Sequence, residues 1–285
     1  MKRSNKLLAG FAAALFLIPL VGMVYVSQVN YKKGTYQDRQ IANENRYSHF
    51  NTPVSGWTSK AMGPFTSVKI DESGAMSFSV VLVNDAQSGV RVPKDIEGSI
   101  TLQVDDQGCL HIALKEGRQN DYRQIVIYSP AFHTFDIEKA SDVELATRQG
   151  VDSLTVNVHH TAAFRLAPGT TMAQLRVEAV DTKEISLHNV SIQRCDLQTG
   201  GANFYATQSS FERLSLKASG NAELQIGTDG GNAQAYTIRH LDINTSDNVA
   251  VKIGDVKIEQ CSGSFSDGTR ISGMQAVNLN QLYKR

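Results

Sequence analysis

Three carboxylates, Asp136, Glu138 and Glu178, are the side chains of this 285-residue sequence best suited to chemistry. Two carboxylic acids on either side of a glycosidic bond can cleave it, one as an acid and the other as a base or nucleophile. Asp136 and Glu138 are two residues apart, so on an extended strand their side chains point to the same face. These three residues are our nominees for a catalytic site of the polysaccharide lyase or glycosidase type.

No metal, cofactor or nucleophile motif accompanies them. His159 and His160 are adjacent, so on an extended chain their rings point in different directions, and no third ligand stands near them. The cysteines Cys109, Cys195 and Cys261 have no CxxC spacing and are too few for a disulfide framework. We expect them to be small buried side chains, with one bridge and a free thiol as the alternative. No phosphate-binding glycine loop or nucleophile elbow occurs.

The composition excludes some classes of partner. Lys and Arg together number 28, as do Asp and Glu, and hydrophobic residues make up 41% of the chain. This balance gives no bulk attraction to nucleic acid, and the hydrophobic content is that of a folded protein. The length allows one large β domain or two small ones.

Residues 1–26 have the pattern of a membrane anchor. Basic residues at positions 2, 3 and 6 precede a run over 7–26 with no charged side chain. Twenty helical residues span about 30 Å, the thickness of the hydrocarbon core. We predict a cytoplasmic tail over 1–6, an uncleaved transmembrane helix over 7–27 and a periplasmic body held at the inner membrane. A cleaved signal peptide is the alternative.

Two sections lead into the body. The polar, aperiodic stretch 28–64 is typical of a juxtamembrane linker, and we expect Trp57 near its end to pack on the edge of the body. Over 65–124 we predict an antiparallel β section. Its clearest element is a hairpin in which Ile100–Val104 faces Leu110–Leu114 across a turn that ends in glycine.

A repeat of about 20 residues runs through the range 125–285. Each unit contains two apolar–polar–apolar segments separated by a short polar turn. The first segments begin at Phe135, Leu154, Leu175, Cys195, Leu214 and Leu241, and the second at Val143, Phe164, Ile185, Phe204, Leu224 and Val251. The one long interval in each series contains the insertion Gly227–Thr237.

A period near 20 with short strands and no helix is typical of a solenoid. We therefore predict an all-β fold, a right-handed parallel β-helix over 125–285 that follows a single N-terminal transmembrane helix. Alternation sends every second side chain inward, so that like residues of successive units stack about 4.8 Å apart. A twisted β-sandwich with a similar number of strands is the alternative. We expect Asn278–Arg285 to cover one end.

This stacking weakens the case for catalysis. If each unit is one rung, Glu138 and Glu178 share an outward column two rungs, or about 10 Å, apart. That separation is at or beyond the upper end for an inverting glycosidase. The outward columns also mix acidic, basic and amide side chains, as a solvated surface does.

The chain from Phe65 onward resembles the auto-transporter adhesin head domain, the GIN domain, of Bacteroidetes-type envelope proteins. The resemblance rests on Ile125–Pro130, on Phe135–Ser141 and on the Ser-Gly-Asn corner within Leu214–Ala222. Corners such as Lys139-Ala-Ser lack the glycine typical of that family. The resemblance implies a β-solenoid in the cell envelope and a role in adhesion.

The sequence therefore predicts a membrane-anchored, extracytoplasmic β-solenoid that serves as a binding, adhesion or envelope-structural module of unknown ligand. Its expected partners are the membrane, through 7–27, and an envelope glycan or protein, with no nucleic acid. The alternative is a carbohydrate-active β-helix enzyme that uses Asp136, Glu138 and Glu178. We expect a binding site to involve the insertion Gly227–Thr237.

Overall fold

The computed structural model describes residues 15, 17–25, 46–72, 77–114, 122–148, 150–228 and 236–273, with the backbone alone at Glu72 and Tyr122. The chain divides into two units, Met1–Arg46 and Tyr47–Arg285. In the first unit, residues 17–25 are helical and their apolar side chains are exposed. The rest of the expected anchor, apart from residue 15, lies outside the described residues. Among the residues that are described, no helix is both long enough and apolar enough to cross a membrane.

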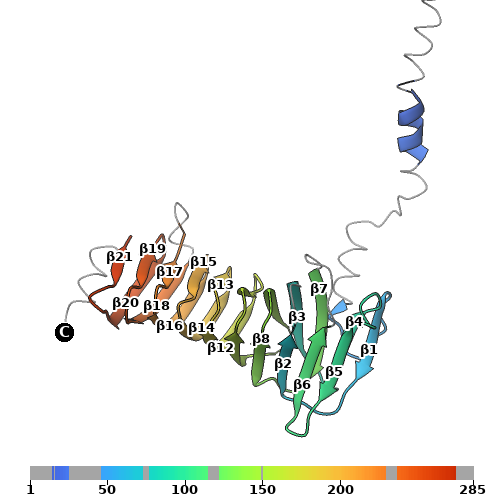
Figure 1. Cartoon of the computed structure of the whole chain (residues 1–285), viewed down its shortest axis with the longest axis horizontal. Coiled ribbons are helices and arrows are strands. Elements are labelled where there is room, and N and C mark those ends of the chain that lie inside the picture. The colour runs from blue at the N-terminus through green and yellow to red at the C-terminus, as the bar shows by residue number, and fades with distance from the viewer. Residues whose placement is uncertain are drawn as a thin grey trace, which may run out of the picture. The chain divides into compact units, whose positions relative to one another are not determined.

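The second unit is built from β-strands in two sheets (Figure 1). Sheet A contains, in spatial order, β1 (Trp57–Ala61), β4 (Gly89–Pro93), β7 (Tyr122–Ser129), β3 (Ser77–Asn84), β9 (Asp142–Arg148), β11 (Ala163–Leu166), β13 (Glu184–His188), β15 (Asn203–Thr207), β17 (Glu223–Ile226), β19 (Ala250–Ile253) and β21 (Arg270–Ser272). Sheet B contains β20 (Lys257–Ser264), β18 (Thr237–Thr245), β16 (Ser210–Ser219), β14 (Ser191–Gly200), β12 (Thr171–Val180), β10 (Ser153–His159), β8 (Thr134–Glu138), β2 (Ser67–Glu72), β6 (Cys109–Leu114) and β5 (Ile100–Val104). The expected all-β class is confirmed.

From β8 onward, successive strands alternate between the two sheets. Each strand pairs in parallel with the strand two places later, as β12 does with β14 and β13 does with β15. We call one sheet B strand, the sheet A strand that follows it and the turn between them a rung. The expected stacking of the second segments, from Val143 to Val251, is confirmed residue by residue.

Alternation of apolar and polar residues explains which face of each strand is buried. In β10 the burial pattern places Leu154, Val156 and Val158 inside and the residues between them at the surface. Stacked rungs therefore bring apolar columns together in one continuous core that reaches from Phe65 to Cys261. Full burial of each large aliphatic or aromatic side chain contributes about 1.5–3 kcal/mol to stability. This burial is the main contribution that keeps the rungs stacked in register.

The long strands of sheet B depart from strict alternation near their beginning. In β14, Ile192 and Cys195 are buried, whereas the two residues between them are both exposed. The same pattern of two successive outward side chains occurs in β12, β16 and β18. Strict alternation would bury one of the two, so the strand departs from regular alternation at this point.

Left-handed residues form the corner at the end of the sheet B strands. Lys139, His160, Asp181 and Asp247 have φ of 52°, 51°, 51° and 64°, and Gly201 and Gly220 fill the same place in their rungs. Backbone bonds continue from rung to rung through the corner, for example from Lys139 N–H to the carbonyl of His159 at 3.1 Å. The corners that lack glycine thus adopt the conformation that glycine accepts most readily.

The section 65–124 differs from the antiparallel one that the sequence predicts. The hairpin of β5 and β6 is antiparallel, with Ile100 opposite Leu114, as expected. However, β2 pairs in parallel with both β6 and β8, and β3 pairs in parallel with both β7 and β9. The two sheets of the repeat therefore continue into this section, because its strands stack on the first rung instead of forming a separate meander.

Part of the expected linker is folded. β1 lies within 28–64 and pairs antiparallel with β4. Trp57 packs beside a second hydrophobic cluster formed by Phe50, Val81, Val83, Val126 and Tyr128. Inward residues of β3 such as Val80 belong to the main core, so β3 is buried on both of its faces. Packing of Trp57 on the body is thus confirmed.

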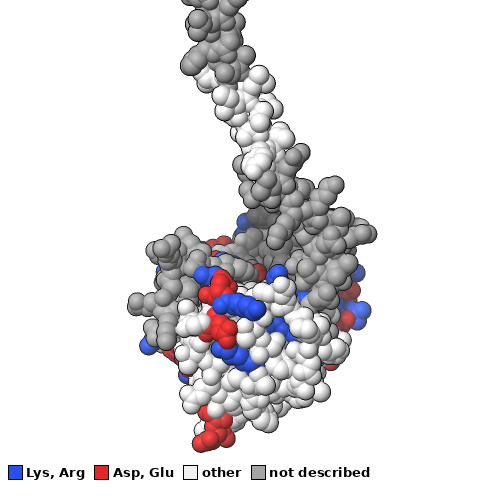
Figure 2. Space-filling model, turned by 90° about the vertical axis from the view of Figure 1, so that its right-hand side faces the viewer, with Lys and Arg blue, Asp and Glu red and all other residues white. Residues whose placement is uncertain are grey.

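Charges at the N-terminal end of this unit are mixed in sign. Figure 2 faces that end and shows Lys, Arg, Asp and Glu side chains interspersed among a large area of uncharged residues. Near the edge strands, Lys60 pairs with Glu97 at 3.4 Å and Arg123 with Asp95 at 2.9 Å. These pairs leave no broad single-sign field among the described residues of this face.

Candidate functional site

A groove of about 580 Å³ lies along the corner where the strands of sheet B end. It crosses four rungs, from β12 through β14 and β16 to β18, and three rung intervals correspond to roughly 14 Å. Its lining is made of Glu178, Ala179, Val180, Gln198, Thr199, Gly200, Lys217, Ala218, Ser219, Asn244, Thr245 and Ser246. A groove that follows the stacking direction fits an extended ligand better than a compact one.

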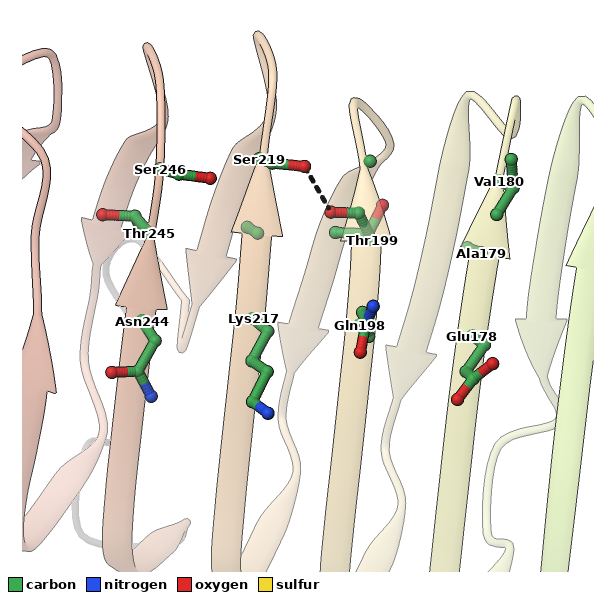
Figure 3. A pocket seen from close by; sticks show the side chains of 12 residues that line it. Glu178, Ala179, Val180, Gln198, Thr199, Lys217, Ser219, Asn244, Thr245 and Ser246 are labelled. Carbon is green, nitrogen blue, oxygen red and sulfur yellow. Dashed lines mark hydrogen bonds between the residues drawn. The ribbon is translucent and has the colours of Figure 1, made fainter.

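The register of the strands positions the polar side chains of the groove. Glu178 stands opposite Gln198, Gln198 opposite Lys217, and Lys217 opposite Asn244. Figure 3 shows these four side chains in a row across neighbouring strands, all on the outward face. Val180, whose exposed fraction is 49%, adds an apolar surface at the corner. The row therefore offers one polar group per rung, beside the exposed apolar side chain of Val180.

The two ends of this row are already bonded. Glu178 accepts hydrogen bonds from Arg176, with 3.2 Å between Nε and Oε1. Asn244 donates to Asp242 at 2.7 Å and accepts from Ser264 at 2.8 Å. Within the part of the chain that the structure describes, Gln198 and Lys217 have no such side-chain partner. Their amide and ammonium groups are consequently free to bind a ligand.

The first rung of the repeat is shifted by two residues from the expected register. Phe135 pairs with Val156, not with Leu154, so Asp136 stands opposite Asn157. Asp136 therefore belongs to the column of Glu178, two rungs away, whereas Glu138 stands opposite His159 in the corner column. The expected shared column of Glu138 and Glu178 is wrong. On its other side β8 pairs with β2, with Val68 opposite Phe135.

Each nominated carboxylate already has a polar partner. Asp136 accepts a hydrogen bond from Asn157 at 2.6 Å, and Glu138 lies 3.1 Å from Nδ1 of His160. Glu178 is paired with Arg176. Two rungs separate the backbones of Asp136 and Glu178 by about 10 Å, with Asn157 between them. The structure thus does not assemble the three nominees into one site.

The adjacent histidines lie at the end of β10, with His160 in the corner that follows it. His160 has the left-handed backbone of the corner, and its ring lies between Glu138 and Asp181, with 3.3 Å from Nε2 to Oδ2 of Asp181. His159 stands in the neighbouring column opposite Val180.

None of the three cysteines, all of which the structure describes, takes part in a disulfide. Cys195 and Cys261 are buried, as expected, but Cys109 is only partly buried. Burial raises the pKa of the Cys195 thiol and, together with the charge of Asp242, raises that of Cys261 to about 11. Burial and the nearby Asp105 raise the pKa of Cys109 to about 11. In the metal-free protein none of these thiols is an activated nucleophile at neutral pH.

The insertion Gly227–Thr237 is attached away from the groove. Residues 229–235 lie outside the described residues, but the chain re-enters the sheet at Thr237, the first residue of β18. The groove uses the other end of that strand, from Asn244 onward. Seven residues of strand separate the two positions by roughly 23 Å. The sequence offers no direct sign of the groove, because single polar residues 19 to 27 positions apart become neighbours only after stacking.

Comparison with known proteins yields distant structural likenesses only. The sequence matches no family model and no curated protein. A solved structure of a proposed adhesin from Parabacteroides merdae covers 77% of this chain and 94% of its own, with 11% identity and a TM-score of 0.43. A proposed adhesin from Parabacteroides distasonis covers 76% of this chain and 94% of its own, with 15% identity and a TM-score of 0.38. A proposed lipid-binding protein from the same species covers 77% of this chain and 96% of its own, with 13% identity and a TM-score of 0.31. At these values the likeness assigns neither a family nor a function, so the resemblance to the GIN domain stays a prediction.

Proposed function

We propose that the strands from β8 (Thr134–Glu138) to β21 (Arg270–Ser272) form a right-handed parallel β-helix and that residues 7–27 hold the body at the outer face of the inner membrane. Parallel in-register pairing along both sheets and the repeated left-handed corners support the solenoid. The uncharged run after the basic N-terminus supports the anchor. In this arrangement the body displays its outward columns to the periplasm.

The function that the site supports best is binding of an extended glycan that carries anionic groups. The main observation behind this proposal concerns Gln198 and Lys217, which lie in the groove on neighbouring rungs. Both lack a partner among the described side chains. An amide can donate to and accept from hydroxyl groups, and an ammonium group attracts a carboxylate or sulfate. Val180 can contact the apolar face of a sugar ring. Adhesion to an envelope or surface polysaccharide would follow from this binding.

The experiment measures binding of the full-length chain, kept in mild detergent, to a panel of soluble neutral and acidic polysaccharides. The Gln198→Ala/Lys217→Ala variant removes the two free groups. The matched control is Gln225→Ala/Lys252→Ala, which changes the same residue types in neighbouring rungs of sheet A. We expect one acidic polysaccharide to bind saturably, with at least about tenfold weaker affinity for the groove variant and no change for the control.

Two results would contradict this proposal. Equal loss of affinity in both double variants would indicate nonspecific attraction to the whole surface. Absence of binding across the panel would favour a purely structural envelope spacer. The enzymatic alternative gains no support from the geometry, because the nominated carboxylates are dispersed and paired.

A further inference from the structure

A second cluster of chemically capable side chains lies at the N-terminal end of sheet B, apart from the groove. The turn between β5 and β6 brings Asp105, Cys109 and His111 together. One carboxylate oxygen, the thiol sulfur and one ring nitrogen all lie within 4.8 Å of one another. The sequence gives little sign of this cluster, since its cysteine belongs to no CxxC pair.

Local structure explains why these three residues meet. Asp105 ends the β5 side of the hairpin, and its Oδ1 accepts the N–H groups of Gln107 and Cys109, both at 2.9 Å. Cys109 and His111 alternate along β6, so both point to the outer face while Leu110 and Ile112 enter the core. The carboxylate of the turn is thereby held over the same face as the thiol and the ring, with Oδ2 left 3.0 Å from Nε2 of His111.

Asp71 orients the histidine from a different strand. It follows Ile70 on β2, which pairs with β6, and its Oδ2 lies 2.9 Å from Nδ1 of His111. A carboxylate bonded to one ring nitrogen is the usual support of a metal-binding histidine, because it fixes the ring and leaves the other nitrogen to the ion. Here the other nitrogen, Nε2, is the one that contacts Asp105.

The cluster also has room and access for a ligand. The side chains of His111 and Asp105 are 33% and 34% exposed, so an ion can reach them from solvent. Among the described residues, the sulfur of Cys109 has no hydrogen-bond partner. In a tetrahedral site with metal–ligand bonds of about 2.0–2.3 Å, the ligand atoms lie roughly 3.3–3.8 Å apart, so side-chain rotations that draw the three atoms together allow them to share one ion.

We propose that Asp105, Cys109 and His111 bind one divalent transition-metal ion of the zinc type, with Asp71 as the orienting group. A thiolate with an imidazole and a carboxylate suits zinc and cobalt and disfavours magnesium and calcium, which prefer oxygen ligands only. On binding, the sulfur–metal bond replaces the S–H bond, and the bond from the metal to Nε2 of His111 replaces the N–H bond that contacts Asp105, so both protons leave to solvent. Three protein ligands leave a fourth position for water, and the ion joins the β5–β6 turn to sheet B.

The test titrates the reduced full-length chain with Co²⁺ and follows the thiolate-to-cobalt absorption band. We expect saturation at one ion per chain, with displacement by Zn²⁺ but not by Mg²⁺ or Ca²⁺. Cys109→Ser should abolish the band, and Asp71→Asn should weaken binding by about 10–100-fold while the band persists. Cys261→Ser and His188→Gln are the matched controls, and both should bind as the wild type does.

Circular dichroism of each variant separates loss of the site from loss of the fold. If Cys109→Ser does not fold, the decision rests on Asp71→Asn, which retains all three ligands. The proposal is overturned if no thiolate band forms in the wild type, if a control removes it, or if Asp71→Asn binds with unchanged affinity. None of these results depends on polysaccharide binding, so failure here and failure of the groove proposal are distinguishable.

Discussion

At the scale of single residues, a buried arginine and a nearly buried aspartate fasten the segment before β1. Arg91 is fully buried and donates hydrogen bonds to the carbonyls of His49, Phe50 and Thr52 at 2.9–3.0 Å. Its guanidinium also lies 4.9 Å from the centre of the Tyr128 ring. Asp85 accepts the N–H of Phe50 at 3.1 Å. These contacts place Phe50 over the second cluster on the outer face of β3 and β7.

Asp85 should make stability depend on pH in the acid range. Burial by itself would raise the pKa of this carboxyl, but hydrogen bonds from the N–H groups of Gln87 and Phe50 and from His49 outweigh burial and lower it. A lowered folded-state pKa means that the stabilisation is complete above the unfolded value, near 3.8, and is lost as the pH falls through the folded value.

We therefore expect Asp85→Asn to lower the free energy of unfolding by about 1 kcal/mol at pH 7, with the difference shrinking below roughly pH 4. Urea denaturation of both proteins across this range measures the effect. Asp95→Asn is the control, because its side chain is 64% exposed and its ion pair with Arg123 should contribute little. A difference between wild type and Asp85→Asn that stays constant down to pH 2 would contradict the assignment.

At the scale of elements, the corner at the end of the sheet B strands repeats one backbone conformation with different residues. Glycine occupies it at Gly201 and Gly220, but lysine, histidine and aspartate occupy it elsewhere. A side chain in the left-handed region costs about 1–2 kcal/mol relative to the right-handed one. The corners without glycine are therefore strained, and the packed rungs on either side hold them.

Lys139 offers the cleanest test, since its side chain is exposed and its φ is 52°. We expect Lys139→Gly to raise the free energy of unfolding by about 0.5–1 kcal/mol, because relief of strain exceeds the added entropy of the unfolded chain. Lys217→Gly, in the middle of β16, should lower it by a similar amount. Thermal melting of the two variants checks this, and two shifts of the same sign would show that the corner conformation does not matter.

At the scale of the whole second unit, the two sheets run without a break from the first strands to β20 and β21. The strands before β8 extend the parallel stack and then close it with the antiparallel strands β1 and β5 at its edges. Residues 47–61, which the sequence marks as linker, are thus part of the folded body. Fragments used to study binding of a ligand or partner must therefore include residues 47–61.

Truncation tests this boundary. We expect 46–285 to fold with the stability of the intact body, whereas 61–285 should lose roughly 3–5 kcal/mol. The shorter chain lacks Phe50 and most of β1, and Arg91 loses the three carbonyl acceptors that this segment supplies. Urea denaturation of the two fragments measures the difference. Equal midpoints would show that 47–60 do not stabilise the body, as expected of a linker.

The sequence by itself determined the strand class, the 20-residue period and the inward residues from Val143 onward. These follow from local alternation, which each segment carries independently of its partners. Only the tertiary structure decided the register of the first rung, where a shift by two residues preserves the apolar pattern yet moves Asp136 into the column of Glu178. It also decided that Asp71 meets His111 across 40 positions and that Gln198 and Lys217 share a groove. Such pairings depend on how whole strands stack, and alternation within one strand is the same for several registers.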